Sequence, residues 1–428
     1  MNTSIPPFQI VRESPEPLGL FFRPGRGDHT VVSQLLSEGR TGMVGGVCDP
    51  CHLSFQDGMR AEFAQRNLYA VLDPLMLELD SAGGHTASRS KLPWADQRVL
   101  TPSDFDATRI DAVSGRIAEF VAQKKFNAVI APAHYLRDGH KDAWVKIDRS
   151  LTVALRRRLN SSGCTDTAIF YPLATSTQHF LEPAHRVGLK AFLSGLPIQA
   201  LWLRIHPFGS QSGDATLRRY ISACQDLHGL RIPLVAEKTG SLGLALLAFG
   251  AVAAIENGVS SGEKFDFGRL SRPPTGKTPF APRPRVYIPS LGIFLPPDQA
   301  QALFDNRGLR QFACRNTACC PRGSESMIKN PRRHFVFTRM DEVGMLSALP
   351  QSLRIQGYME RLLRPATDNI GRAMANDKLD DATKQKLEKH RRKLDGWRAT
   401  LGQLGRLSPP RTVAAPLERR IVRVRATA

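Results

Sequence analysis

Apolar and polar positions follow two different periods between about Leu68 and Asn257. Short apolar runs of strand length are separated by longer segments in which apolar residues recur every three or four positions. This order predicts a parallel sheet covered by helices. The runs interpreted as strands are Leu75–Leu79, Ala128–Ala131, Ala168–Leu173, Ala200–Ile205, Pro233–Ala236 and Ala251–Ile255. The helical segments include Arg109–Lys124, Ala143–Leu159 and Thr216–Leu227.

Two further segments could bring the number of strands to eight. One is Val286–Phe294, and the other lies somewhere in the first ~65 residues, so that a closed barrel becomes possible. A chain of 428 residues is long enough for such a barrel with a smaller appendage. We therefore expect an α/β fold of the TIM-like (β/α)8 barrel type, with the barrel in residues 1–300.

Two smaller parts are expected after the barrel, a cysteine/histidine module in residues 301–365 and a basic helical extension in residues 366–428. The stretch Arg269–Arg285 is rich in Pro, Gly, Arg and Lys, which predicts a basic loop within the barrel domain. The helical period of Asp368–Leu404 places a charged face along the extension, which is either solvated or in contact with phosphate groups. That face carries Lys384, Lys386, Lys389, Arg391, Arg392 and Lys393.

The charge of the chain indicates a polyanionic partner. There are 59 Lys and Arg against 39 Asp and Glu, which gives a formal net charge of +20 and a pI near 10.1. Such a surface favours nucleic acid through counterion release. A basic protein that merely stays soluble is the alternative, and an anionic membrane surface is a weaker one.

The sequence predicts a cytoplasmic protein that does not cross a membrane. The segment from Met1 to Pro17 contains prolines and glutamates where a signal peptide has an apolar core. The longest apolar run, Leu242 to Ile255, has 14 residues, and a span needs ~18. Seven cysteines, an odd number, fit thiols and metal ligands better than a disulfide framework.

The segment Asp80-Ser81-Ala82-Gly83-Gly84 presents a carboxylate on a glycine turn, directly after the run interpreted as the first strand. Barrel enzymes place their catalytic groups at the carboxyl ends of the strands. A carboxylate at this position can act as a base, as a nucleophile or as a stabiliser of positive charge. The alternative is an aspartate that caps the next helix.

This segment resembles the Asp-Ser-Gly-Gly signature of the tRNA-guanine transglycosylase superfamily. The resemblance implies a barrel enzyme that cleaves the N-glycosidic bond of a base in a polynucleotide, and some relatives insert 7-deazapurines into DNA. It also implies a structural zinc site after most of the barrel. Cys314, Cys319 and Cys320 with the later His334 form a comparable set here, and thiolates with imidazole are ligands that zinc prefers. A reduced, cysteine-rich loop is the alternative.

A second cysteine pair, Cys48 and Cys51 with the adjacent His52, could also bind a metal. A redox pair and packed thiols are each commoner explanations of this spacing than a metal site. The sequence leaves these readings open.

The resemblance also implies a second acid near the end of a later strand, and Glu256 is the nearest carboxylate to that place. The base-reading aspartate of the superfamily is absent, because Ile130 to Tyr135 stand there, and its glycine pair is absent from Arg204 to Gly209. These departures favour hydrolysis over base exchange. We expect Asp80 and Glu256 to be catalytic, together with His206, which stands just past the end of a predicted strand.

Other polar and aromatic residues near predicted strand ends are expected to surround an extruded base or the phosphate backbone. The expected base-binding residues are Ser81, Gly83, Gly84, His134, Tyr135, Phe208 and Glu237. The expected nucleic-acid contacts are Arg204, Lys238, Arg269, Arg272 and Lys277.

The favoured function is a DNA glycosylase that removes a modified base from foreign or phage DNA and leaves an abasic site, in defence against phage. The first alternative is a transglycosylase that exchanges a base for a 7-deazapurine in DNA or tRNA. The second is a non-catalytic nucleic-acid-binding protein, and an unrelated barrel enzyme with a small anionic substrate is a further possibility. The sequence does not select among oligomeric states.

Overall fold

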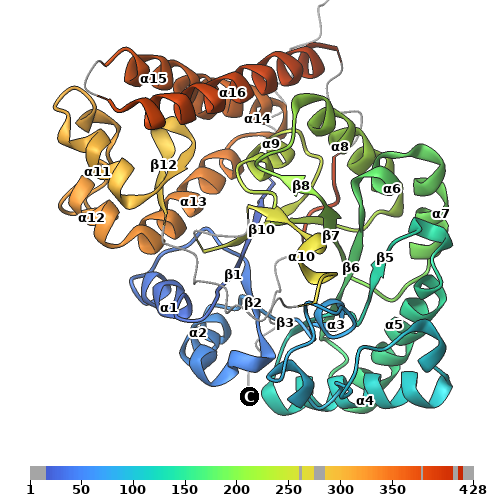
Figure 1. The fold of residues 1–428 in the computed structure, drawn as a ribbon. Helices are drawn as coiled ribbons and strands as arrows, with labels where there is room; N and C mark the ends of the chain where they lie inside the picture. Colours follow the sequence, from blue (N-terminus) through green and yellow to red (C-terminus); the bar gives the residue numbers. More distant parts are fainter. Residues whose placement is uncertain (1–15, 260–262, 274–284, 377–378, 408–412, 418–428) are drawn as a thin grey trace, which may run out of the picture.

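The computed structural model describes residues 16–259, 263–273, 285–376, 379–407 and 413–417 (Figure 1). Its centre is a closed barrel of parallel strands in which β1 pairs with both β2 and β10, while β4 pairs with β6. The barrel strands, in order around the ring, are β1 (Gly19–Arg23), β2 (Gly45–Cys48), β3 (Tyr69–Leu72), β4 (Ala128–Ile130), β6 (Ala168–Ser176), β7 (Ala200–His206), β9 (Leu234–Glu237) and β10 (Ala254–Gly258). The expected (β/α)8 barrel is confirmed.

Most predicted strands match the barrel, but Leu75–Leu79 is not a strand. The strand is β3, which ends at Leu72 because Pro74 lacks the N–H that the ladder needs. Met76–Leu79 instead form the short helix α3. Val286–Phe294 is also not a barrel strand, since it forms a separate antiparallel hairpin of β12 (Val286–Ile288) and β13 (Ile293–Leu295). The first part of the chain supplies two barrel strands, β1 and β2.

Helices cover the outside of the barrel (Figure 1). The three predicted helical segments correspond to α4, α5 and α8. The helices up to the end of the barrel are α1 (His29–Ser37), α2 (Leu53–Gln65), α3, α4 (Ala107–Lys124), α5 (Trp144–Ser161), α6 (Thr177–Leu181), α7 (Pro183–Leu193), α8 (Asp214–Leu227), α9 (Leu242–Ala248) and α10 (Phe267–Leu270). Two short strand pairings lie beside the barrel at its carboxyl end, β5 (Tyr135–Leu136) with β6, and β8 (Phe208–Gly209) with β11 (Lys264–Phe265).

The interior of the barrel is packed with apolar side chains from alternate strand positions, as expected for a barrel of this size. The largest are Phe21, Phe170 and Trp202, all fully buried. Leu417 joins this interior cluster from far along the chain. It lies next to Val44 and Tyr69, which stand at the amino ends of β2 and β3, so Leu417 closes the amino end of the barrel.

The rest of the chain packs against the barrel. The hairpin β12–β13 and helix α13 lie on one side, and α14 to α16 run across the top of Figure 1. Helix α16 is attached to the carboxyl-end loop after β8, because Lys393 Nζ donates to the Ser210 carbonyl at 2.8 Å and Trp397 Nε1 to that of Ser212 at 3.1 Å. The helices here are α11 (Pro297–Asp305), α12 (Ser324–Lys329), α13 (Pro331–Ser347), α14 (Gln351–Tyr358), α15 (Arg364–Met374) and α16 (Asp381–Leu407).

Helix α13 contacts β1, α1 and α9, so it also completes the ring of helices. The expected helical extension is present as α15 and α16. In the part of the chain that the structure describes, no helix is both long and apolar enough to cross a membrane.

Candidate active site and metal centre

Five polar side chains form a layer inside the carboxyl end of the barrel. Each stands two positions after an apolar residue of the interior cluster on the same strand, so the alternation of side chains turns it inward. The layer consists of Arg23, Asp73, Arg204, Glu237 and Glu256, and the apolar residues that precede them are Phe21, Val71, Trp202, Val235 and Ala254. This is the end at which barrel enzymes bind substrate.

Two arginines hold this polar layer together. Arg23 Nη1 donates to Asp73 Oδ2 at 2.7 Å, and Arg23 Nη2 donates to Glu237 Oε2 at 3.2 Å. Arg204 Nε donates to the same Glu237 oxygen at 2.7 Å, and Arg204 also contacts Asp73. Glu256 is held less tightly, with Oε1 3.5 Å from Arg23 Nε. Neither Glu256 oxygen accepts a hydrogen bond from the described residues, although the side chain is fully buried.

The three carboxyl groups of the layer differ in protonation. Burial opposes ionisation of Glu237, but Arg204 and Arg23 outweigh it and lower its pKa to about 2. The same two arginines hold the pKa of Asp73 well below its usual value, again against burial. Burial, together with the Glu237 carboxylate, raises the pKa of Glu256 to about 7. Two guanidinium groups thus balance two carboxylates. Glu256 is protonated below neutral pH and about half protonated near pH 7.

Sequence reasoning missed two members of this layer, Arg23 and Asp73. Asp73 was missed because the strand was predicted at Leu75–Leu79 and not at β3. The dipeptide Asp73-Pro74 after an apolar run does mark the end of a strand. Arg23 follows the apolar run of β1, in a region for which no strand had been located. The acid at the end of the third barrel strand is therefore Asp73, and Asp80 follows α3.

Asp80 lies in a buried chain with His134 and Asp148. His134 Nε2 is 3.0 Å from Asp80 Oδ2, and its Nδ1 is 2.6 Å from Asp148 Oδ1. Asp80 Oδ1 also accepts from the backbone N–H of Leu100 at 3.1 Å. Burial lowers the pKa of His134, but the carboxylates of Asp148 and Asp80 outweigh it and raise the pKa to about 9. The Asp80 carboxylate is thus already paired with an imidazolium.

The glycine turn after Asp80 packs against α10. Ser81 Oγ donates to the Leu77 carbonyl at 2.6 Å, and the Gly83 N–H donates to the Leu270 carbonyl at 2.7 Å. A Cβ on Gly83 would lie 2.1 Å from the Arg272 carbonyl oxygen, and one on Gly84 would lie 2.4 Å from that of Glu78. The glycines therefore allow close approach of backbone to backbone.

Two of the aromatic residues expected to stack on a base have partners within the protein. Phe208 is buried and stacks on Tyr220, with ring centroids 3.9 Å apart. Tyr135 stacks on Phe267 of α10, with centroids 3.6 Å apart. His206 accepts a hydrogen bond from the Phe267 N–H at 3.1 Å, so it also supports α10. These contacts place α10 over the carboxyl end of the barrel.

The expected phosphate contacts lie in different environments. Arg204 is buried in the polar layer and occupied by Glu237 and Asp73, so it is not a surface group. Lys238 is partly exposed, with Nζ 3.4 Å from Glu237 Oε1. Arg269 and Arg272 are exposed. Lys277 and most of the basic loop, residues 274–284, lie outside the described residues.

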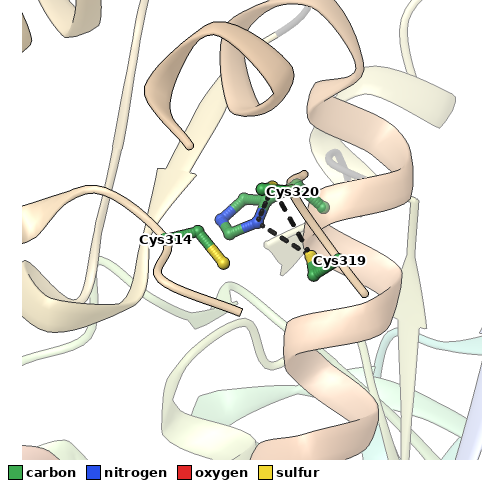
Figure 2. Close-up of side chains that lie close together, drawn as sticks. Cys314, Cys319 and Cys320 are labelled. Atoms are coloured by element: carbon green, nitrogen blue, oxygen red, sulfur yellow. Dashed lines mark hydrogen bonds between the residues drawn. The ribbon is translucent and has the colours of Figure 1, made fainter. Parts of the chain in front are cut away.

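The four predicted metal ligands come together in space. The ligand atoms of Cys314, Cys319, Cys320 and His334 all lie within 4.8 Å of one another, and Figure 2 shows the three cysteines converging from their loop. Both Cys319 Sγ and Cys320 Sγ are 3.4 Å from His334 Nδ1, and neither cysteine needs a positive φ. The cluster can hold a metal ion.

The environment of His334 fits a metal ligand. Its Nε2 is 3.0 Å from the Tyr287 carbonyl, so Nε2 carries the proton and Nδ1 is free to accept. Cys319 Sγ and Cys320 Sγ are 3.6 Å apart, close to the ~3.8 Å between two sulfurs around a tetrahedral zinc ion. The donor set of three thiols and one imidazole is one that zinc prefers.

Cys48, Cys51 and His52 do not form such a cluster. Among the described residues, only the Cys314 set brings three or more such ligand groups together. His52 Nδ1 is instead 3.2 Å from Asp49 Oδ2. Burial raises the pKa of Cys48 to about 12 and that of Cys51 to about 11, so both are neutral thiols near pH 7.

Comparisons with known proteins add little to this picture. No model of a known family and no curated protein matches the chain. Among solved structures, a psychrophilic family 10 endo-β-1,4-xylanase aligns over 57% of this chain and 87% of its own, with 9% identity and a TM-score of 0.38. A family 26 β-mannanase from Bacteroides ovatus aligns over 61% and 85%, with 10% identity and a TM-score of 0.33. The carboxyl transferase domain of Rhizobium etli pyruvate carboxylase aligns over 90% and 60%, with 11% identity and a TM-score of 0.35. Likeness at this level says nothing about the reaction.

Proposed function

We propose that the chain is a DNA glycosylase, an enzyme that hydrolyses the N-glycosidic bond of a base in DNA at the carboxyl end of its barrel. The observation that carries the proposal is the pair Glu256 and Glu237, two buried carboxyl groups on neighbouring strands whose pKa values are driven apart. Cleavage of a glycosidic bond uses one protonated and one ionised carboxyl group. The basic surface and the resemblance to tRNA-guanine transglycosylases favour a polynucleotide substrate.

In the proposed reaction the target nucleotide leaves the stack and its base enters the barrel mouth. The neutral Glu256 carboxyl donates its proton to the departing base, and the C1′–N bond breaks. The ionised Glu237, fixed by Arg204 and Arg23, stabilises the positive charge that develops on the sugar. Water adds to C1′ and returns a proton to Glu256, which leaves a free base and an abasic site.

Asp80 has a supporting place in this scheme. Because Asp80 and His134 are paired beneath the turn that contacts α10, they are proposed to position the segment over the mouth of the barrel. A modified base in foreign DNA remains our proposal for the substrate. Exchange of the base for a 7-deazapurine would require a second base to replace water.

A structural zinc ion is proposed in the Cys314, Cys319, Cys320 and His334 cluster. It would cross-link the loop that carries the cysteines to α13, which itself contacts β1. Zinc bound in this way contributes to folding and takes no part in bond cleavage.

The test is incubation of normal and phage-modified DNA with wild-type protein, Glu256→Gln and Glu237→Gln. Abasic sites are converted to breaks with an abasic-site endonuclease, and released bases are identified by mass spectrometry. Wild-type protein should release one base species, and both variants should be at least about 100-fold slower, the usual contribution of a general acid.

The matched control is Glu342→Gln. Glu342 is another buried glutamate with a raised pKa, but it lies on α13 and accepts a hydrogen bond from Tyr287 Oη at 2.8 Å. It should keep its activity. Intact DNA with every substrate, or equal loss in all three variants, would contradict the proposal.

A further inference from the structure

A cation-lined cavity lies between the barrel and α16, beside the carboxyl end of the barrel. Its volume is about 440 Å³. The barrel side is formed by Ser210, Ser241 and Glu263, from the loops that follow β8, β9 and β10. The loops after β9 and β10 are continuous with the strands that carry Glu237 and Glu256. The cavity therefore adjoins the candidate active site.

The opposite wall of the cavity is one face of α16. Lys386, Lys389, His390 and Lys393 follow one another at helical spacing and all line the cavity, as does Arg285 from the segment before β12. Glu263 is the carboxylate among the lining residues, and it already accepts from Arg285 Nη2 at 3.1 Å and from Ser210 Oγ at 3.3 Å. Three lysines and one arginine against one glutamate leave a local excess of positive charge.

The cationic groups of the cavity are partly desolvated. Burial, with repulsion from Arg285, lowers the pKa of Lys386. Burial also lowers the pKa of Lys393, to which Lys389 adds repulsion. His390 is buried next to Lys393, and its pKa falls to about 3, so it is neutral. An anion in the cavity would relieve the repulsion among the lysines, and phosphate is the anion that such a cluster fits best.

We infer that this cavity binds a phosphate group of the polynucleotide strand whose base enters the barrel. The inference rests on the proposed function, because it places the strand across the same end of the barrel as Glu256. The lysines of α16 hold the backbone and carry no sequence information. Helix α16 is thus a positioning element for the strand.

The test measures binding of a fluorescent DNA oligonucleotide by the full chain as a function of salt concentration. The variants are Lys389→Gln, whose side chain is exposed, and the double variant Lys386→Gln/Lys389→Gln. Binding by the double variant should weaken about tenfold, uniformly across sequences, and the slope of log Kd against log salt should fall by about one. Lys389→Gln alone should also weaken DNA binding and lower the salt slope.

The matched control is Lys384→Gln. This variant removes the same charge from the same helix. Lys384 precedes Lys386 by two residues, so its side chain lies on the opposite side of the helix, and it does not line the cavity. It should bind as the wild type does. A 5′-mononucleotide and inorganic phosphate serve as competitors and distinguish a site for a strand from a site for free phosphate. If the cavity binds only free phosphate, the double variant should bind these two ligands more weakly, while its binding of the oligonucleotide should not change.

The outcomes separate this inference from the proposed function. Unchanged DNA affinity and an unchanged salt slope in the double variant would overturn the inference, even if the protein releases a base. If the double variant binds DNA more weakly but the wild-type protein never releases a base, phosphate binding in the cavity is supported and the glycosylase function is contradicted.

Discussion

Replacing Glu256 with Gln should make the protein more stable at alkaline pH, although the variant should release the base at least about 100-fold more slowly. The raised pKa of Glu256, about 7 against a usual 4.5, means that the folded protein retains a proton that the unfolded chain releases. Stability therefore falls as the pH rises from about 4.5 to 7, by on the order of 3 kcal/mol at ~1.4 kcal/mol per pH unit. Gln has nearly the same shape and does not titrate. Relative to wild type, the variant should gain that amount between pH 4.5 and pH 8.

Glu237→Gln is the informative counterpart, because the expected pH dependence has the opposite sign. The lowered pKa of Glu237, about 2, makes its stabilising effect present above pH 4.5 and lost as the pH falls toward 2. This variant should lose stability most at neutral pH, where Arg204 and Arg23 keep their charge without a full set of partners.

The measurement is urea unfolding, followed by circular dichroism, of wild type and both variants at pH 5, 6.5 and 8. A further titration at pH 3 covers the range in which the contribution of Glu237 is expected to change. The reasoning requires the difference between Glu256→Gln and wild type to change with pH in the stated direction. A difference that is the same at all three pH values would show that Glu256 is ionised throughout, and the proposed general acid would then be wrong.

Two further predictions concern the parts that surround the site. Leu417→Ala should destabilise the protein by about 2 to 4 kcal/mol, because it opens a cavity at the amino end of the barrel, whereas Leu353→Ala at an exposed position should change stability by less than ~0.5 kcal/mol in the same urea titration. Cys319→Ser should reduce bound zinc, measured by mass spectrometry of the purified protein, and lower the melting temperature, while Cys48→Ser should leave the zinc content unchanged; equal zinc in both variants would argue against the Cys314 cluster as the ligand set.

The repeating pattern of the chain predicted a parallel sheet covered by helices, because strands buried on both faces read as apolar runs and the helices between them keep their period. Closure into a barrel was expected from the possible extra strands and from the family resemblance. The error at Leu75–Leu79 arose because a short apolar run has no periodicity that tells a strand from a helix. That error placed Asp80 at a strand end and hid Asp73. The cluster of Cys314, Cys319, Cys320 and His334 was expected from their residue types and from the family resemblance, and the structure brings the four together.

The pairing of side chains across the barrel was not predictable. Arg23, Asp73 and Glu256 come from the first, third and last barrel strands, and only closure of the ring brings them together. Likewise, nothing near Lys386 in the sequence indicates that Glu263 and Arg285 face it. Contacts of this kind depend on the register of distant elements, which local patterns do not encode.

The position of Leu417 bears on how the chain acquires its fold during synthesis. All eight barrel strands leave the ribosome long before Leu417 does, so the newly made ring has an unsealed apolar floor around Phe21 and Trp202. Helix α16, attached at the opposite end of the barrel, precedes that segment in the chain. The final residues of the described chain thus cover the amino end of the barrel after all its strands have been made. A nascent polypeptide stalled before these residues would expose apolar side chains to chaperones and proteases.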